Sequence, residues 1–314
     1  MSAAISRRQV LLGIVGVGGG VAASFAPTAS AEEHPAHPVA PPDAVAMLYD
    51  NTICTGCKAC MMACNDANGL PSDTSLSKEG LWDMPTDLNS KTKNIIKLYE
   101  EPDGTGFAFV KKQCMHCLDP ACVSGCPFGA LKKEELWGAV TWNSSLCIGC
   151  RYCEVACPFN VPKFEWDKWN PKIVKCEFCF DQRLKENQQP ACTGVCPTGA
   201  VIFGKRVDLL AKAKERIATS PEKYFEKRVY GEHEAGGTQV LYLSNVAFDK
   251  IGLPKLGSTS LAHYATKVTS VIYKWLSGPI LAAVVLGAVI KRNWDRHEAE
   301  RPEREKKTGL RDQL

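Results

Sequence analysis

The cysteines are the residues of this sequence that are best suited to do chemistry, and their spacing is more informative than their number. There are sixteen of them, and they fall into four groups of four. Thiolates at short spacings can hold iron–sulfur clusters, bind zinc or form disulfides. The groups are Cys54, Cys57, Cys60 and Cys64; Cys114, Cys117, Cys122 and Cys126; Cys147, Cys150, Cys153 and Cys157; and Cys176, Cys179, Cys192 and Cys196.

The spacing within each group favours iron–sulfur clusters. Groups one and three read C-x₂-C-x₂-C-x₃-C, the run of bacterial ferredoxins, in which three close thiolates hold one cubane and the fourth points toward a second. Groups two and four carry extra residues between their second and third cysteines and keep the terminal C-x₃-C-P. Pro127, Pro158 and Pro197 follow the last cysteines of groups two to four, where a fixed φ and a missing N–H help to turn the chain away.

Zinc is the main alternative, and disulfides are a weaker one. Zinc sites usually combine two pairs of ligands instead of four-cysteine runs that end in Cys-Pro. Cysteines at C-x₂-C spacing rarely have good disulfide geometry, and a chain of 314 residues is long for a disulfide scaffold. Because the ferredoxin-like pattern recurs four times, we expect four [4Fe–4S] clusters.

Over roughly residues 46–207 the chain resembles the four-cluster ferredoxin-like subunits of periplasmic and membrane oxidoreductases, such as formate dehydrogenase, dimethyl sulfoxide reductase and hydrogenase 2. The resemblance implies two pseudo-symmetric ferredoxin-like units, in which the outer groups share two clusters and the inner groups share two. It implies four ligand sets: Cys54, Cys57, Cys60 and Cys196; Cys176, Cys179, Cys192 and Cys64; Cys114, Cys117, Cys122 and Cys157; and Cys147, Cys150, Cys153 and Cys126.

Features outside the cysteine groups are similar to the HybA-type subunits of membrane-bound [NiFe] hydrogenase 2. They are an export signal, a C-terminal anchor and the short sequences 112–117, 236–241 and 253–256. The similarity implies a subunit that catalyses no reaction itself. Such a subunit relays electrons from the hydrogenase large and small subunits to an integral membrane quinone-binding subunit. The alternative is the same role in a molybdenum or tungsten enzyme of the formate dehydrogenase or dimethyl sulfoxide reductase type.

The elements that must position the cysteines are short, so we expect a loop-rich α+β fold. Strand-like runs are predicted at residues 107–111, 139–142 and 200–203, and a helix at 209–217. The insertion 65–113, with one further strand at 95–99, is expected to decorate the cluster domain. Residues 208–267 are predicted to form a C-terminal extension and linker.

The N-terminal segment, residues 1–31, resembles a twin-arginine export signal. Arg7 and Arg8 precede a glycine-rich apolar run, and Ala29-Ser30-Ala31 offers a cleavage site, so we expect cleavage after Ala31. An ordinary Sec signal is the alternative. Export of folded proteins by the twin-arginine machinery suits a protein that must receive its clusters in the cytoplasm. Residues 32–45 read as an exposed linker.

Near the C-terminus, residues 268–290 are apolar except for Lys274. As a helix they would reach roughly 34 Å, enough to cross a bilayer. The charged tail 291–314 begins with Lys291 and Arg292, which predicts a single pass with a cytoplasmic C-terminus and the cysteine domain on the periplasmic face of the bacterial inner membrane. A buried core helix is the alternative.

Outside the cysteines, no nucleophile–base arrangement stands out, and a net charge of +4 gives no basis for nucleic-acid binding. Basic residues among the motifs could offset cluster charge, although solvated surface residues are as good an interpretation; they are Lys58, Lys111, Lys112, Arg151 and Lys175. His116 is interpreted as a loop residue in preference to a donor near a cluster. Trp142, Trp166 and Trp169 are expected to pack in the core or at an interface.

Overall fold

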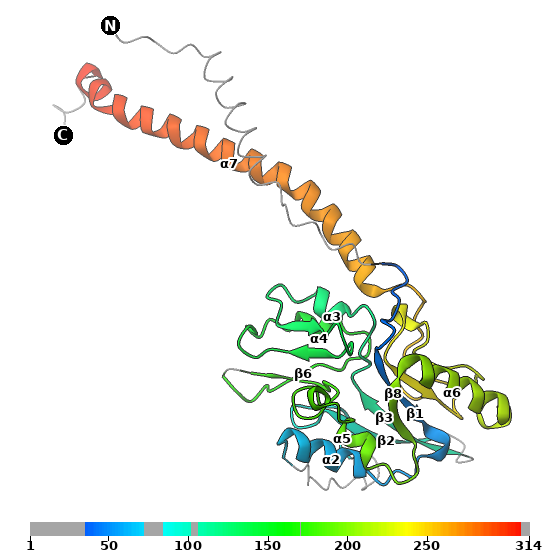
Figure 1. The fold of residues 1–314 in the computed structure, drawn as a ribbon. Helices are drawn as coiled ribbons and strands as arrows, with labels where there is room; N and C mark the ends of the chain where they lie inside the picture. Colours follow the sequence, from blue (N-terminus) through cyan, green and yellow to red (C-terminus); the bar gives the residue numbers. More distant parts are fainter. Residues whose placement is uncertain (1–34, 72–83, 102–105, 170, 309–314) are drawn as a thin grey trace. The chain divides into compact units, whose positions relative to one another are not determined.

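A three-stranded sheet lies at the centre of the fold (Figure 1). The computed structural model describes residues 35–71, 84–101, 106–169 and 171–308, without the side chains of 267–277 and 300–308. Strand β1 (Val45–Asp50) pairs antiparallel with β8 (Val201–Lys205) and parallel with β9 (Val240–Leu243). All of β1 except Val45 is buried, in keeping with a central strand covered on both faces.

The described part of the chain also contains three two-stranded antiparallel hairpins. They are β2 (Asn94–Glu100) with β3 (Phe107–Gln113), β4 (Leu131–Lys133) with β5 (Val140–Trp142), and β6 (Lys163–Phe164) with β7 (Ile173–Val174). The strands predicted at 95–99, 107–111, 139–142 and 200–203 fall in β2, β3, β5 and β8, and the observed elements confirm all four.

The prediction that residues 65–113 merely decorate the domain is wrong. Ile95 and Ile96 of β2 are fully buried and belong to the main hydrophobic core, together with Phe109 of β3. The hairpin is therefore part of the core, because its apolar residues are needed to cover the cysteine groups. Strand β3 also carries the fully buried Lys111 toward those groups.

Short helices place the cysteine groups next to one another. Helix α2 (Ala59–Asn68) contacts α5 (Ala191–Gly194), and α3 (Ala121–Ser124) contacts α4 (Tyr152–Ala156). Groups one and four therefore meet, and groups two and three meet. The described residues also include four 3₁₀ turns: η1 (Asn51–Ile53), η3 (Leu184–Glu186), η4 (Pro221–Lys223) and η5 (Glu234–Gly236).

The predicted C-terminal extension packs as part of the same body. It begins within α6 (Arg206–Thr219), which includes the predicted helix 209–217 and buries Leu209 and Ala213 against the sheet. Arg216 of α6 forms a 2.9 Å ion pair with Asp50, whose side chain is almost fully buried. Further along, every residue of β9 is buried and the strand pairs with β1, so this stretch completes the central sheet.

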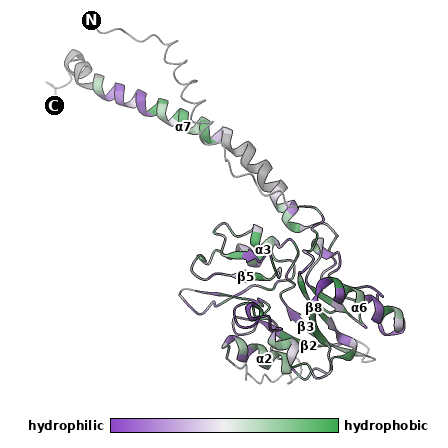
Figure 2. Ribbon diagram, in the orientation of Figure 1, coloured by the Kyte–Doolittle hydropathy of each residue, from purple (hydrophilic) through white to green (hydrophobic). Residues whose placement is uncertain are grey.

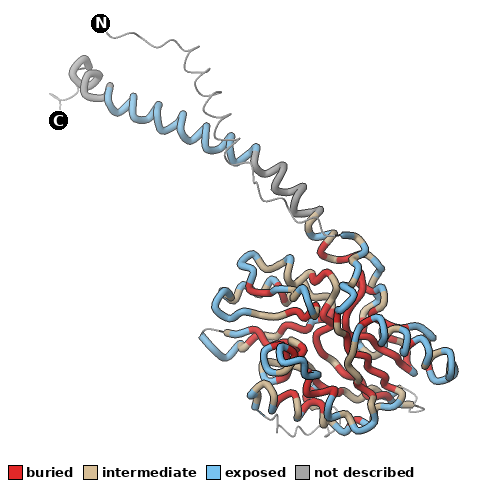
Figure 3. The backbone as a smooth tube through the Cα atoms, in the orientation of Figure 1, coloured by how far each residue is buried: buried red, intermediate tan, exposed pale blue. Residues whose placement is uncertain are grey.

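Helix α7 (Leu261–Thr308) follows the extension. Its described apolar side chains between residues 280 and 290 are exposed and give way to charged residues after 290 (Figures 2 and 3). Within the described residues, no helix is both long enough and apolar enough to span a bilayer. Part of the predicted span 268–290 and the end of the tail 291–314 fall on undescribed side chains or residues, and the signal 1–31 lies outside the described chain.

Candidate iron–sulfur site

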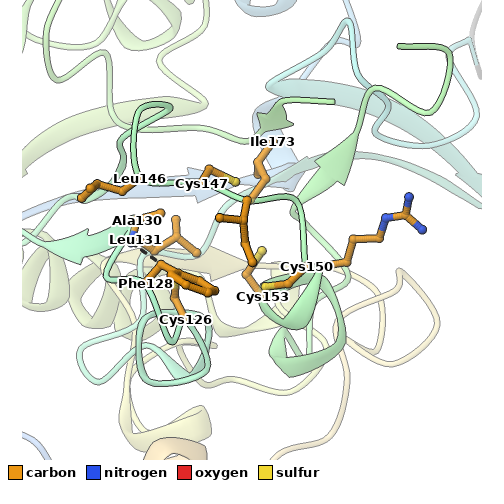
Figure 4. Close-up of a pocket in the computed structure, with 11 residues that line it drawn as sticks. Cys126, Phe128, Ala130, Leu131, Leu146, Cys147, Cys150, Cys153 and Ile173 are labelled. Carbon is orange, nitrogen blue, oxygen red and sulfur yellow. Dashed lines mark hydrogen bonds between the residues drawn. The ribbon is translucent and has the colours of Figure 1, made fainter. Parts of the chain in front are cut away.

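Two hollows in the structure are each lined by four cysteines. Around one lie Cys126, Cys147, Cys150 and Cys153, with Phe128, Leu131 and Ile173 among the apolar walls (Figure 4). Around the other lie Cys54, Cys57, Cys60 and Cys196. In both hollows three thiols come from one group and the fourth is the last cysteine of another group.

The remaining eight cysteines form two further sets. The members of each set lie close enough to influence one another's pKa. Burial raises the pKa of Cys117 well above its usual value, and nearby thiols raise it further; they are those of Cys122, Cys157 and Cys114. Burial also raises the pKa of Cys192 to about 12, and Lys111 opposes this rise while Cys64, Cys60 and Cys179 add to it. Cys176 is coupled to Cys64 and Cys192. All sixteen cysteines lie among the described residues, and none of them forms a disulfide.

The backbone repeats one feature in all four groups. The second residue after the first cysteine adopts a left-handed conformation, with φ between 48° and 75°; these residues are Gly56, His116, Gly149 and Phe178. A second repeat follows the Cys-Pro pairs, where the third residue after the cysteine is again left-handed; these residues are Gly129, Asn160 and Gly199. Such turns expose successive N–H groups on one side of the chain, where anionic sulfur can accept them.

Several donors already point at sulfur atoms. The Ala130 N–H donates to Cys126 Sγ at 3.3 Å, and Asn68 Nδ2 donates to Cys64 Sγ at 3.6 Å. Cys196, which is only partly buried, differs from Cys117 and Cys192: burial raises its pKa, but hydrogen bonds from groups that include the Val201 N–H and the Thr198 side chain outweigh this effect and lower the pKa below its usual value. Such donors stabilise thiolate ligands and tune a bound cluster.

The basic residues named from the sequence separate into two kinds. Lys111 and Lys175 are fully buried, and Lys111 Nζ donates to Asn94 Oδ1 at 2.6 Å. Lys58, Lys112 and Arg151 are only partly buried, and Lys112 pairs with Asp87. Sequence reasoning missed Lys133, whose Nζ donates to the Cys117 carbonyl at 2.7 Å and whose pKa burial lowers to about 7.

His116 is a loop residue, as predicted, but its full burial was missed. Its ring stacks on Phe178 with a centroid separation of 3.7 Å, and Nδ1 accepts a 2.9 Å hydrogen bond from the Val140 N–H. Burial, assisted by Lys175 and Lys133, lowers its pKa well below the usual value, so the ring is neutral with its proton on Nε2. Among the described residues, Nε2 has no hydrogen-bond partner. The sequence does hold one signal for this burial: His116 and Phe178 occupy equivalent positions in groups two and four, and Phe178 is a large apolar residue.

The three tryptophans differ in their surroundings. Trp142 packs against the smaller core around Leu131 and Val140, as expected. Trp166 is exposed and lies 3.7 Å from the guanidinium of Arg151, and Trp169 is completely exposed. Trp142 thus packs in a core, and packing of Trp166 and Trp169 at an interface stays a prediction.

The thiol-lined sites have the chemistry that iron–sulfur clusters require: four sulfur donors each, apolar walls and N–H groups directed at sulfur. In the described chain, no three or more His, Cys, Asp or Glu side chains converge closely enough to hold a single metal ion.

Comparison with known proteins identifies these sites. Two family models, both described as 4Fe–4S dicluster domain, match residues 53–130 and 105–206. The chain is 38% identical to the hydrogenase-2 operon protein HybA of Escherichia coli O157:H7 over 296 residues, covering 84% of this chain and 88% of the relative. It is 36% identical to the formate dehydrogenase iron–sulfur subunit of Haemophilus influenzae, covering 67% and 69% of the two chains.

The protein is thus an iron–sulfur protein built from 4Fe–4S dicluster domains, and it carries four [4Fe–4S] clusters whose chemistry is electron transfer. More narrowly, the chain belongs to the family of the hydrogenase-2 operon protein HybA, to which the formate dehydrogenase iron–sulfur subunits are related. The zinc and disulfide alternatives are set aside by these matches.

Proposed function

We propose that this chain is the non-catalytic electron-transfer subunit of a membrane-bound hydrogenase. In this proposal it receives electrons from the hydrogenase large and small subunits and passes them to an integral membrane subunit that binds quinone. The observation that carries the proposal is the assembly of sixteen thiols into four sets within one body. The 38% identity with HybA over 84% of the chain supports hydrogenase as the partner.

We propose the four sets as the ligand sets of the four clusters, with three cysteines from one group and one from another in each. Each cluster, when bound, takes up and releases one electron at a time. The protein supplies the thiolates, directs N–H groups at sulfur and buries seven of the sixteen cysteines. Cys57 and Cys150 are exposed, which supports electron exchange with partner subunits at the two sets that contain them.

We further propose that the cysteine domain lies on the periplasmic face of the bacterial inner membrane, after export by the twin-arginine machinery. Arg7 and Arg8 support the export route. The exposed apolar side chains of α7 between residues 280 and 290, followed by Lys291 and Arg292, support a C-terminal anchor in the lipid bilayer with a cytoplasmic tail.

A second candidate is the same relay in a molybdenum or tungsten enzyme of the formate dehydrogenase or dimethyl sulfoxide reductase type. The specific observation in its favour is the 37% identity with the nitrate-inducible formate dehydrogenase iron–sulfur subunit of Escherichia coli K12, which covers 67% of this chain and 72% of the relative.

The test is an anaerobic affinity purification of the detergent-solubilised full chain with its partners, followed by metal analysis and activity assays. About sixteen irons per chain are expected from four cubanes, together with nickel in a co-purifying protein and quinone reduction driven by hydrogen. Sixteen irons with molybdenum or tungsten would favour the second candidate. A purified chain without iron would refute both.

A further inference from the structure

Lys111 is a fully buried ammonium group on strand β3, beside the first cysteine group. Its amine donates a 2.6 Å hydrogen bond to Asn94 Oδ1 on the paired strand β2. Asn94 is also buried, and its Nδ2 donates to the Cys60 carbonyl at 3.4 Å. The β2–β3 hairpin thus holds the amine firmly against α2.

Lys111 interacts with thiols of two different sets. Its electrostatic neighbours are Cys60, which lies in the hollow with Cys54 and Cys57, and three members of the set around Cys192. Cys60 and Cys64 are one turn apart on α2 and belong to different sets.

The negative charge that stabilises the buried ammonium of Lys111 must come from the cluster sites. A buried ammonium is costly unless negative charge lies near it. In the part of the chain that the structure describes, no carboxylate is within ion-pair distance of Lys111. A cubane with four thiolates is anionic and gains one more negative charge when it is reduced, so a nearby fixed cation favours the reduced form.

We infer that the positive charge of Lys111 raises the reduction potentials of two clusters at once. One cluster is held by the set that contains Cys60, and the other by the set that contains Cys64. This inference rests on the proposed electron-transfer function and deepens it. The other buried amines have different partners from Lys111. Lys175 donates to the carbonyls of Val140 and Cys176, and Lys133 donates to the carbonyl of Cys117.

The experiment is a redox titration of the full chain, reduced with dithionite and followed by electron paramagnetic resonance, with iron content measured on the same samples. In Lys111→Met we expect the reduced-to-oxidised ratio of two clusters to fall at least tenfold at a fixed potential, which is 59 mV for one electron. The other two clusters should change less than twofold. Lys112→Met is the matched control, because Lys112 is adjacent, partly exposed and paired with Asp87, and it should change every ratio less than twofold.

A second variant guards against failure of Lys111→Met to assemble. Asn94→Asp has nearly the same shape and places a carboxylate beside the ammonium, so it should lower the same two potentials. Full iron content with unchanged ratios in either variant would overturn the inference. Loss of clusters in both variants would make Lys111 an assembly residue and would also overturn it. If the wild-type chain itself held no reducible clusters, the proposed function would fail instead.

Discussion

At the scale of single residues, the cysteine groups depend on polar neighbours that are buried with them. His116 and Phe178 occupy equivalent left-handed positions in groups two and four, and their stacked rings join the two groups. The Nδ1 of His116 satisfies the Val140 N–H of strand β5, so the ring also ties that strand to the cysteine loop. An aliphatic side chain could fill the space but could not accept this hydrogen bond.

We therefore expect His116→Leu to destabilise the protein by about 1–3 kcal/mol, the cost of a buried N–H without a partner. The measurement is the urea concentration at which half of the visible iron–sulfur absorption is lost. His233→Leu serves as the control, since His233 is exposed and a surface change there should stay within about 0.5 kcal/mol. Equal midpoints for the two variants would contradict the structural role of His116.

At the scale of elements, the cysteine loops require close approach of backbone to core side chains. Gly56 has φ of +67°, and a Cβ built on it would lie 2.3 Å from the ring of Phe109 in β3. Gly69, which ends α2, has nearly the same φ of +61° but no atom within 4 Å of its Cβ position. A comparison of alanine substitutions at the two glycines therefore separates the cost of the left-handed backbone from the cost of crowding against Phe109.

We expect Gly56→Ala and Gly69→Ala each to lose about 1–2 kcal/mol from the left-handed conformation. Gly56→Ala should lose roughly 1–3 kcal/mol more, because Phe109 must move. It should also reduce the iron content, since Gly56 lies between Cys54 and Cys57, whereas Gly69→Ala should keep all its iron. Urea midpoints and iron analysis check both statements, and a Gly69→Ala variant as damaged as Gly56→Ala would refute the crowding argument.

At the scale of the whole molecule, a strand distant in sequence completes the core. The four residues of β9 are at most 1% exposed, and the Tyr242 hydroxyl donates to the Lys111 carbonyl at 2.7 Å. Burying a large apolar side chain contributes about 1.5–3 kcal/mol, so four of them approach the whole stability of a typical domain. The extension is thus a condition for the cluster domain to fold.

A chain that ends at Thr219 should therefore fail to retain clusters. A chain that ends at Lys267 keeps β9 and should hold about sixteen irons, but it should no longer sediment with membranes if the proposed anchor is correct. Iron analysis of the soluble and membrane fractions, compared with the full chain, measures both effects. Full iron content in the shorter chain would show that β9 is dispensable.

The sequence by itself determined the chemistry, because ligand spacing in an iron–sulfur motif is local. The four cysteine runs, their Cys-Pro endings and the strands around them could be read from neighbouring residues, and the matched 4Fe–4S dicluster models agree with that interpretation. The resemblance also implied how the groups associate. Arg7, Arg8 and the span 268–290 remain sequence-based predictions.

Only the tertiary structure decided which residues surround the cysteines. Burial depends on contacts between segments far apart in the chain, and periodicity within a segment does not report them. For that reason Lys111 and Lys112, adjacent on one strand, could not be told apart from the sequence, although one is buried among thiols and the other is paired at the surface. The same reason explains why the local pattern predicts decoration for the β2–β3 hairpin and an extension and linker for β9, since both bury side chains against segments that are distant in the sequence.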